Sequence, residues 1–290
     1  MDERDWLTIK VLYKHKNITK AAETLFVSQP ALTSRIRQIE ESFGIKMIYR
    51  GNRGIHFTPE GEYLVKVASD VLTQIRSVRE HALNMQNETR GTLRLASCNY
   101  LAKFKLPRLL GRFKELYPAV EFNVINAWSR DICKMIYNQD VHIGFVRNDY
   151  GWIGEKVVLH EEQICIASKK EFALEDLPDM SRIDYNTDPS YKALLDKWWG
   201  EHFSRPPRVS MTVSQMDISK AMVANGLGYS ILPDTILNDV GQIYMLPVLN
   251  EAGKPIIRKT TMVYQKEILE LKLVKKFVDF SKTFDFNELG

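Results

Sequence analysis

The chain has 290 residues, of which 44% are hydrophobic and 26% are charged, with 15 glycines and 11 prolines. This length suggests two or three domains, and this composition excludes a disordered or fibrous chain. The formal net charge of +4 is small, so a nucleic-acid-binding surface has to be sought in the local placement of basic residues.

Three features of the chain indicate a reducing, aqueous compartment. The cysteines Cys98, Cys133 and Cys165 are scattered, which is typical of buried thiols and not of a disulfide or zinc framework. The first ten residues lack the apolar segment of a secretory signal. No apolar run reaches the roughly 18 residues that a membrane span needs. We therefore expect a cytoplasmic protein with no membrane association.

Three short helices are predicted in the first 44 residues. Apolar residues at helical spacing mark the first helix, from about residue 2 to 15. Thr19 is expected to cap the second. Ser28 caps the third, Pro30 lies just inside its start, and Gly44 ends it. Three helices with a tight turn before the third predict a helix-turn-helix.

The third helix has an apolar face and a polar face. Its apolar face carries Leu32, Ile36, Ile39 and Phe43. A polar, partly cationic face suits the major groove of DNA, where residues near the helix N-terminus reach base edges. The polar face carries Gln29, Thr33, Ser34 and Arg37, with Arg35 on its flank.

A β-hairpin is predicted after this helix. Two apolar stretches flank the turn-rich residues 51–54. Arg50 and Arg53 on this hairpin are expected to contact DNA phosphates as a wing, which positions the protein without reading sequence. The predicted DNA-binding residues are Thr19, Ser28, Gln29, Pro30, Thr33, Ser34, Arg35, Arg37, Arg50 and Arg53.

The segment AAETLFVSQPALTSRIRQIEESFGIKMIYRGNRGIHFTPEGE resembles the signature of LysR-type transcriptional regulators. It contains the paired alanines, the VSQPAL turn and cap, the arginine-bearing third helix and the TPEG ending of the wing. This resemblance implies a winged helix-turn-helix that binds double-stranded DNA. The alternative is a trihelical domain that binds protein and not DNA.

A long helix is predicted from the Thr58 cap and Pro59 to about residue 87. An apolar stripe at alternating steps of four and three is typical of a coiled coil. The chain's own domains could cover this stripe instead. In LysR-type proteins the corresponding helix is a dimerisation linker, and dimers or tetramers on an imperfect palindrome are implied. The stripe consists of Leu64, Ala68, Val71, Ile75, Val78, Ala82 and Met85.

Beyond residue 90 the pattern alternates between strands and helices, which predicts an α/β domain with mostly parallel sheets. Helices are expected at about residues 107–117, 191–202 and 215–225. The candidate strands are TLRLASC, VEFNVIN, HIGFVR, EQICIAS, RVSMTV, GYSIL and TTMVY.

Ligands on such sheets lie at the carboxyl ends of strands, beside helix N-termini. Hydroxyl, amide and guanidinium groups at these ends suit a small anion such as a carboxylate. Alternatively, Ser97 and Ser214 only cap helices, and Arg147 or Arg258 is only a surface residue or part of a structural ion pair. The predicted effector-binding residues are Ser97, Cys98, Asn99, Tyr100, Arg147, Ser214, Gln215 and Arg258.

The second half is similar to the two-subdomain, periplasmic-binding-protein-like effector domain of LysR-type regulators. The segments WSRDICKMIYNQDVHIGFVRN and DPSYKALLDKWW resemble the citrate-responsive catabolite control proteins of low-GC Gram-positive bacteria. This resemblance implies that Arg147 and Arg258 contact a tricarboxylate. Cys98 stands where that subgroup has a hydroxyl donor, and Tyr100 replaces a smaller apolar residue. An amino acid or a sulfur metabolite is the alternative effector.

An enzyme is not expected, because the chain has no GxSxG, Walker, GxGxxG or HExxH motif. No catalytic residue, metal or cofactor is predicted, and the adjacent acids Glu161 and Glu162 are expected to be solvated. A plain solute-binding protein would leave the helix-turn-helix unexplained.

The predicted fold is α+β overall, in three parts: a winged helix-turn-helix over residues 1–58, a coiled-coil linker helix over 59–89, and an α/β effector domain over 90–290. Subdomain I of the effector domain takes about residues 90–161 and 265–290, and subdomain II about 162–264.

Overall fold

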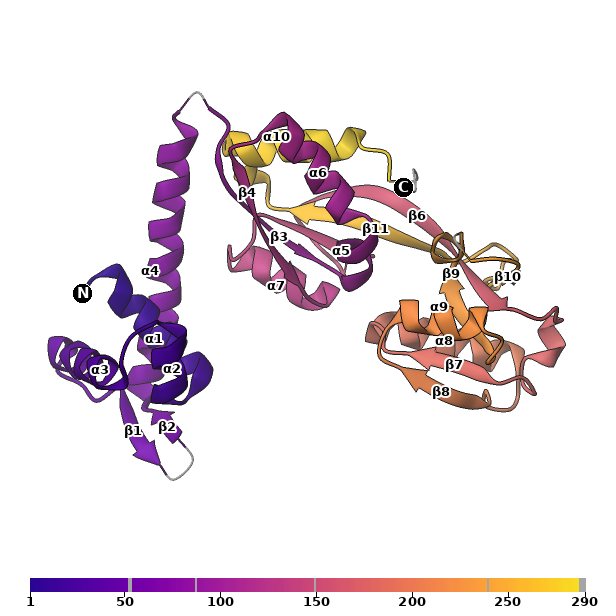
Figure 1. Cartoon of the computed structure of the whole chain (residues 1–290), viewed down its shortest axis with the longest axis horizontal. Coiled ribbons are helices and arrows are strands. Elements are labelled where there is room, and N and C mark those ends of the chain that lie inside the picture. The colour runs from indigo at the N-terminus through magenta and orange to yellow at the C-terminus, as the bar shows by residue number, and fades with distance from the viewer. Residues whose placement is uncertain (52–53, 87, 149, 239, 287–290) are drawn as a thin grey trace. The chain divides into compact units, whose positions relative to one another are not determined.

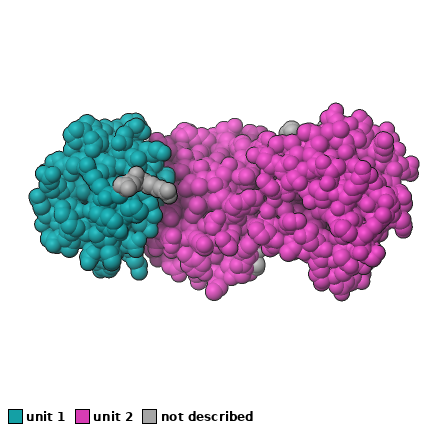
Figure 2. All heavy atoms as spheres, turned by 90° about the horizontal axis from the view of Figure 1, so that it is seen from below, with its two compact units in different colours: residues 1–88 teal, residues 89–290 magenta. Residues whose placement is uncertain are grey.

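The computed structural model describes residues 1–51, 54–86, 88–148, 150–238 and 240–286. The chain forms two compact units, residues 1–88 and residues 89–290 (Figure 2). Within the described residues, no helix has the length and apolarity that a membrane crossing requires.

The first unit begins with three helices, α1 (Glu3–His15), α2 (Ile18–Thr24) and α3 (Gln29–Phe43) (Figure 1). The expected cap Thr19 lies inside α2. Asn17 caps this helix instead, because its side chain accepts a hydrogen bond from the Lys20 N–H at 3.0 Å. Ser28 caps α3, accepting from the Ala31 N–H, and Gly44 ends it at a φ of 65°, as predicted.

The predicted wing is present as an antiparallel hairpin of β1 (Ile48–Gly51) and β2 (Gly54–Phe57). A Cβ at Gly54 would lie 2.5 Å from the Lys16 carbonyl oxygen, and its φ is 126°. Both observations require glycine there. Thr58 then caps the long helix α4 (Pro59–Asn84) by accepting from the Gly61 N–H.

The core of the first unit joins α1, α2, α3, the hairpin and the beginning of α4. The apolar stripe of α4 is divided by this packing. Leu64 and Ala68 are buried within the unit, whereas Val78 is 69% and Met85 is 83% exposed. The chain's own domain therefore covers the start of the stripe and leaves its end open.

The described residues of the second unit form a nine-stranded sheet in the order β4-β3-β5-β11-β6-β9-β7-β8, with β10 beside β6. The sheet is mixed, whereas mostly parallel sheets were expected. Strand β11 runs antiparallel to β5 and β6, and β6 runs antiparallel to β9 and β10. Its strands are β3 (Gly91–Ser97), β4 (Val120–Asn126), β5 (Ile143–Arg147), β6 (Glu155–Ser168), β7 (Arg182–Tyr185), β8 (Val209–Val213), β9 (Tyr229–Pro233), β10 (Tyr244–Pro247) and β11 (Ile257–Tyr264).

Two long strands connect the two subdomains of this unit (Figure 1). In β6, residues 155–163 pair with β11 and residues 164–168 pair with β9. Strand β11 pairs with β5 of the first subdomain over residues 260–264. The return crossing therefore lies along β11.

Each subdomain has its own core. Phe113, Phe145 and Phe277 lie in the core of the first, and Trp198 and Tyr229 in the core of the second. The helices around these cores are α5 (Asn99–Phe104), α6 (Leu106–Leu116), α7 (Ser129–Tyr137), α8 (Pro189–His202), α9 (Met216–Ala224) and α10 (Lys272–Thr283), with short 3-10 turns η1 (Leu174–Asp176), η2 (Asp234–Leu237) and η3 (Lys266–Glu270).

Candidate functional site

The polar face of α3 is the candidate nucleic-acid surface of the first unit. Gln29, Ser34 and Arg37 are exposed, and Thr33 is half-buried. The Gln29 amide donates to the Thr33 hydroxyl at 3.2 Å, so the two side chains lie on one face of the helix. Thr19, Ser28 and Pro30 are exposed too. This face offers hydrogen-bonding groups and one guanidinium beside the N-terminus of a capped helix.

Arg35 was predicted to contact DNA, but its guanidinium is engaged inside the unit. Its Nε donates to the Asp5 carboxylate at 2.7 Å, and its Nη2 lies 3.2 Å from the Asp2 carboxylate. Burial raises the pKa of Asp5, but hydrogen bonds from Asp2 and Arg35 outweigh it and lower that pKa below its usual value. Arg35 therefore ties α3 to the start of α1.

The wing is anchored to α3 by one carboxylate. Glu40 accepts hydrogen bonds from the Met47 N–H at 2.8 Å, the Ile48 N–H at 3.2 Å and the Lys46 ammonium at 2.8 Å. Arg50 on β1 is exposed. Arg53, the other predicted wing contact, lies outside the described residues.

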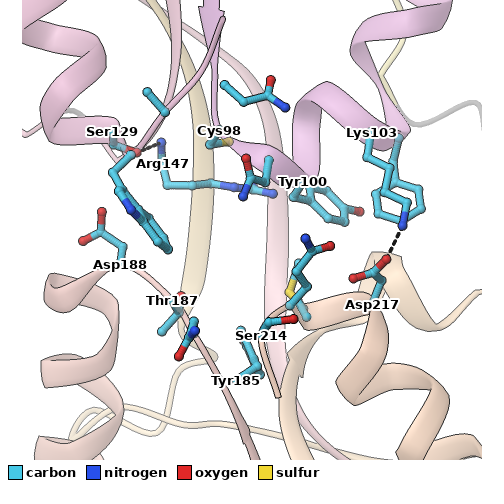
Figure 3. A pocket seen from close by; sticks show the side chains of 18 of the residues that line it. Cys98, Tyr100, Lys103, Ser129, Arg147, Tyr185, Thr187, Asp188, Ser214 and Asp217 are labelled. Carbon is cyan, nitrogen blue, oxygen red and sulfur yellow. Dashed lines mark hydrogen bonds and ion pairs between the residues drawn. The ribbon is translucent and has the colours of Figure 1, made fainter. Parts of the chain in front are cut away.

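A cavity of about 590 Å³ lies in the second unit, with walls from both subdomains (Figure 3). Its size is in the range of small-molecule sites. The predicted effector residues Cys98, Asn99, Tyr100, Arg147, Ser214, Gln215 and Arg258 all line it. Ser97 does not: its side chain is fully buried and its hydroxyl donates to the Cys98 carbonyl at 3.2 Å.

Several lining residues were not predicted. Trp128, Ser129 and Asp131 come from the start of α7, and Thr187 and Asp188 follow β7. The strand-end rule applies to both groups, since they follow β4 and β7. No site residue was expected after β4, and no strand was expected at residues 182–185.

Two helices direct their N-termini at the cavity. The caps of α7 and α9 are Trp128 and Gln215, and neither makes a side-chain capping hydrogen bond within the described residues. The first N–H groups of a helix need partners, and they carry partial positive charge. The N-terminus of α7 therefore favours an electron-rich ligand group, whereas the first N–H groups of α9 already have the Asp217 carboxylate as a partner.

Arg147 and Arg258 share one buried carboxylate, that of Glu162. The Nη1 of Arg147 donates to Glu162 Oε2 and, at 2.7 Å, to the Thr260 hydroxyl. The Nε and Nη2 of Arg258 lie 3.2 Å from the same Oε2. The Thr235 hydroxyl donates to Oε1 at 2.6 Å. The expectation that Glu162 is solvated is wrong, because its side chain is fully buried.

The electrostatics of this cluster favour the charged forms. Burial raises the pKa of Glu162, but Arg258 and Arg147 outweigh it and lower that pKa to about 2. Burial lowers the pKa of Arg258, and Glu162 reverses the direction and raises it. The cluster is thus a buried group of three ions and not two free arginines.

Tyr100 forms an aromatic wall beside the cluster. The Arg147 guanidinium lies 4.7 Å from the centre of its ring, a cation–π distance. Its hydroxyl lies 3.1 Å from that of Thr235. Burial first, and then the charge of Glu162, raise the pKa of Tyr100. This phenol is therefore a neutral hydrogen-bonding group near the arginines.

The cavity has the character of a binding site. In the described part of the chain, no group of three or more His, Cys, Asp or Glu side chains could hold a metal ion. The cavity presents the cationic cluster of Arg147 and Arg258, a helix N-terminus at α7, and the aromatic ring of Tyr100.

Comparison with known proteins finds matches along almost the whole chain. The family model for the bacterial regulatory helix-turn-helix protein, lysR family, matches residues 4–62, and that for the LysR substrate binding domain matches residues 86–284. The uncharacterized HTH-type transcriptional regulator YraN of Bacillus subtilis (strain 168) is 39% identical over 282 residues, covering 97% of this chain and 98% of the relative. The regulator YkuM of the same organism, also described as uncharacterized, is 34% identical over 274 residues, 94% of each chain.

Solved structures share the fold. Full-length CbnR complexed with its target DNA has a TM-score of 0.67 at 19% identity, over 97% of this chain and 99% of the other. Full-length OxyR from Pseudomonas aeruginosa has a TM-score of 0.65 at 18% identity, over 99% and 96% of the chains. At such identities the likeness concerns the arrangement of the elements and not the ligands.

Proposed function

The chain belongs to the LysR family of DNA-binding transcription regulators, and we propose that it controls metabolic genes in response to a small carboxylate bound in the cavity of its second unit. Members of this family are regulators and not enzymes.

One observation carries the effector proposal. The Nη2 of Arg147 is buried and has no hydrogen-bond partner among the described residues, although Arg147 lines the cavity. A buried, unpartnered guanidinium nitrogen costs free energy unless a ligand satisfies it. A carboxylate is the group that matches a guanidinium edge best.

Citrate is the first compound to test, because the sequence resembles the citrate-responsive regulators. Amino acids and sulfur metabolites with a carboxylate are the alternatives. Each can place one carboxylate at Arg147, so the resemblance alone favours citrate.

The DNA-binding proposal rests on α3 and the wing. Gln29 and Thr33 lie near the N-terminus of α3 on its polar face, where they would read base edges. Arg50, together with Arg53, would contact phosphates. Two such units, paired through the exposed stripe residues at the end of α4 (Val78 and Met85), would bind two half-sites of an imperfect palindrome.

The effector would act through the two subdomains. A ligand that holds them together changes how paired effector domains pack, and thereby the spacing or angle of the DNA-binding units. This requires that the ligand bind one assembly more tightly than the other. Identical DNA footprints with and without a bound effector would contradict this mechanism.

A thermal-shift titration of the full chain tests the effector. An effector at a hundred times its Kd should add about 2.7 kcal/mol of stability. The compounds are citrate, other di- and tricarboxylates, amino acids and sulfur metabolites. Arg147→Met should abolish the response, and Arg112→Met, which removes a surface arginine paired with Glu115, should retain it. If none of these compounds raises the Tm of the wild-type protein, the carboxylate proposal is wrong.

A further inference from the structure

Glu162 places a carboxylate of the protein between the two arginines that face the cavity. We propose that Glu162 is a specificity-determining residue, which occupies the shared side of Arg147 and Arg258 and so limits this cluster to one effector carboxylate. The inference rests on the proposed function, because it concerns the effector of the same cavity.

Hydrogen bonds to both carboxylate oxygens hold Glu162 in this position. Oε2 accepts from the guanidinium groups of Arg147 and Arg258, and Oε1 accepts from the hydroxyl of Thr235. The glutamate lies behind the cavity wall, fully buried, whereas both arginines form part of that wall. An effector therefore meets the arginines from the cavity side, with Glu162 already bound on the other.

The charges of the cluster leave one unit uncompensated. Two guanidinium groups and one carboxylate sum to a single positive charge. The hydrogen-bond donors of Arg147 are also only partly used. Its Nη1 donates to Glu162 and Thr260, whereas its Nη2 has no partner among the described residues. One unpartnered guanidinium nitrogen of Arg147 and one net positive charge match one carboxylate.

The remaining charges around the cavity do not add a second cationic site. Lys103 is the other cationic side chain of the lining, and it pairs with Asp217. Asp131 and Asp188 also line the cavity. A second effector carboxylate beside the cluster would face these acids without a compensating cation, which raises the cost of binding it.

The test compares two variants that remove the same charge from adjacent positions. Glu162→Gln keeps the shape and removes the buried carboxylate. Glu161→Gln is the matched control, because Glu161 is 53% exposed and pairs with Lys259 on the surface. The probes are succinate and its monoamide succinamate, which share a carbon skeleton and differ by one charge, together with citrate. Isothermal titration calorimetry on the full-length chain gives each Kd.

We expect E162Q to shift the ratio of the two Kd values toward succinate by about tenfold or more relative to wild type, because the cluster gains one positive charge in a low-dielectric wall. Citrate affinity should rise in the same variant, and E161Q should match wild type. Equal ratios in the three proteins, or a folded E162Q that binds neither succinate nor citrate, would overturn the proposal.

A second variant covers the case in which E162Q does not fold. Thr235→Val has nearly the same shape and removes the hydrogen bond that holds Oε1. It should move the ratio in the same direction by a smaller factor, and an unchanged ratio in a folded T235V again contradicts the proposal. Failure of the proposed function is a different result, namely wild-type DNA binding that no effector changes.

Discussion

Lys103 and Asp217 form an ion pair that joins the two subdomains across the cavity (Figure 3). Lys103 lies on α5 of the first subdomain, and Asp217 lies in the first turn of α9 of the second. A second link is the hydrogen bond between the hydroxyls of Tyr150 and Ser190, at 2.9 Å. Both links must break if the subdomains separate to admit or release a ligand.

Lys103→Gln should speed the release of effector without unfolding the protein. The lysine is 56% exposed, so the loss of the ion pair should cost about 1 kcal/mol or less. Dissociation measured by stopped flow should be a few-fold faster. Lys197→Gln, which breaks a surface ion pair with Glu201, is the control and should leave the rate unchanged. An unaltered rate in K103Q would show that this pair does not restrain opening.

Acid should destabilise the second unit through Glu162. Its folded pKa of about 2 is below the ordinary value of 4.5, so its contribution is present above about pH 4.5 and is lost as the pH falls toward 2. Tm measured between pH 2 and 6 should fall more steeply for wild type than for E162Q. At neutral pH, E162Q should be less stable by about 3 kcal/mol, since it leaves buried arginines uncompensated. Parallel curves for the two proteins would contradict this assignment.

Much of the fold could be predicted, because its helices and strands carry local signals. The Ser28 cap, Pro30 and Gly44 marked α3 at both ends. The start of α7 carried no such signal, since Trp128 is its cap and makes no side-chain capping hydrogen bond among the described residues. Strand β7 has only four residues, Arg182–Tyr185, too few for alternation to be recognised.

The position of the site followed from strand ends, but its electrostatics did not. Arg147 ends β5, and Arg258 lies at the start of β11, which runs antiparallel to β5 and so begins beside the carboxyl end of that strand. Glu162, their common partner, was expected to be solvated together with Glu161. Adjacent residues on a strand point to opposite faces, so Glu161 and Glu162 could not share one environment. Which of the two is buried depends on the packing of β6 against β11 and η2, far away in sequence.

Glu40→Ala should destabilise the winged helix-turn-helix. The substitution removes the acceptor of the Met47 and Ile48 N–H groups, the first of them buried, which should cost about 2 kcal/mol. Burial raises the pKa of Glu40, but hydrogen bonds from Lys46 and the two N–H groups lower it overall, so this contribution is lost as the pH falls through the folded pKa. Urea denaturation with hydrogen exchange of the first unit measures the effect, and the exposed neighbour Glu41→Ala serves as control.

Arg50→Ala should weaken binding to all DNA sequences alike. Loss of one phosphate contact should reduce the slope of log K against log salt by about one.

Gln29→Ala should instead relax discrimination at one base pair by about 1–3 kcal/mol. Both are measured by fluorescence anisotropy on matched and mutated operators. If Q29A keeps full discrimination, the polar face of α3 is not the surface that reads the bases.

Val78→Asp should separate the oligomer while leaving the first unit folded. Val78 is 69% exposed and lies in the open end of the α4 stripe, whereas Leu64 and Ala68 are already covered by the unit's own core. A carboxylate at a coiled-coil contact would have to be buried without a partner, which is strongly unfavourable. Thr73→Asp adds the same charge on the opposite side of α4 and should be tolerated. Sedimentation equilibrium measures the mass of both variants, and a V78D protein of wild-type mass would place the dimer contact elsewhere.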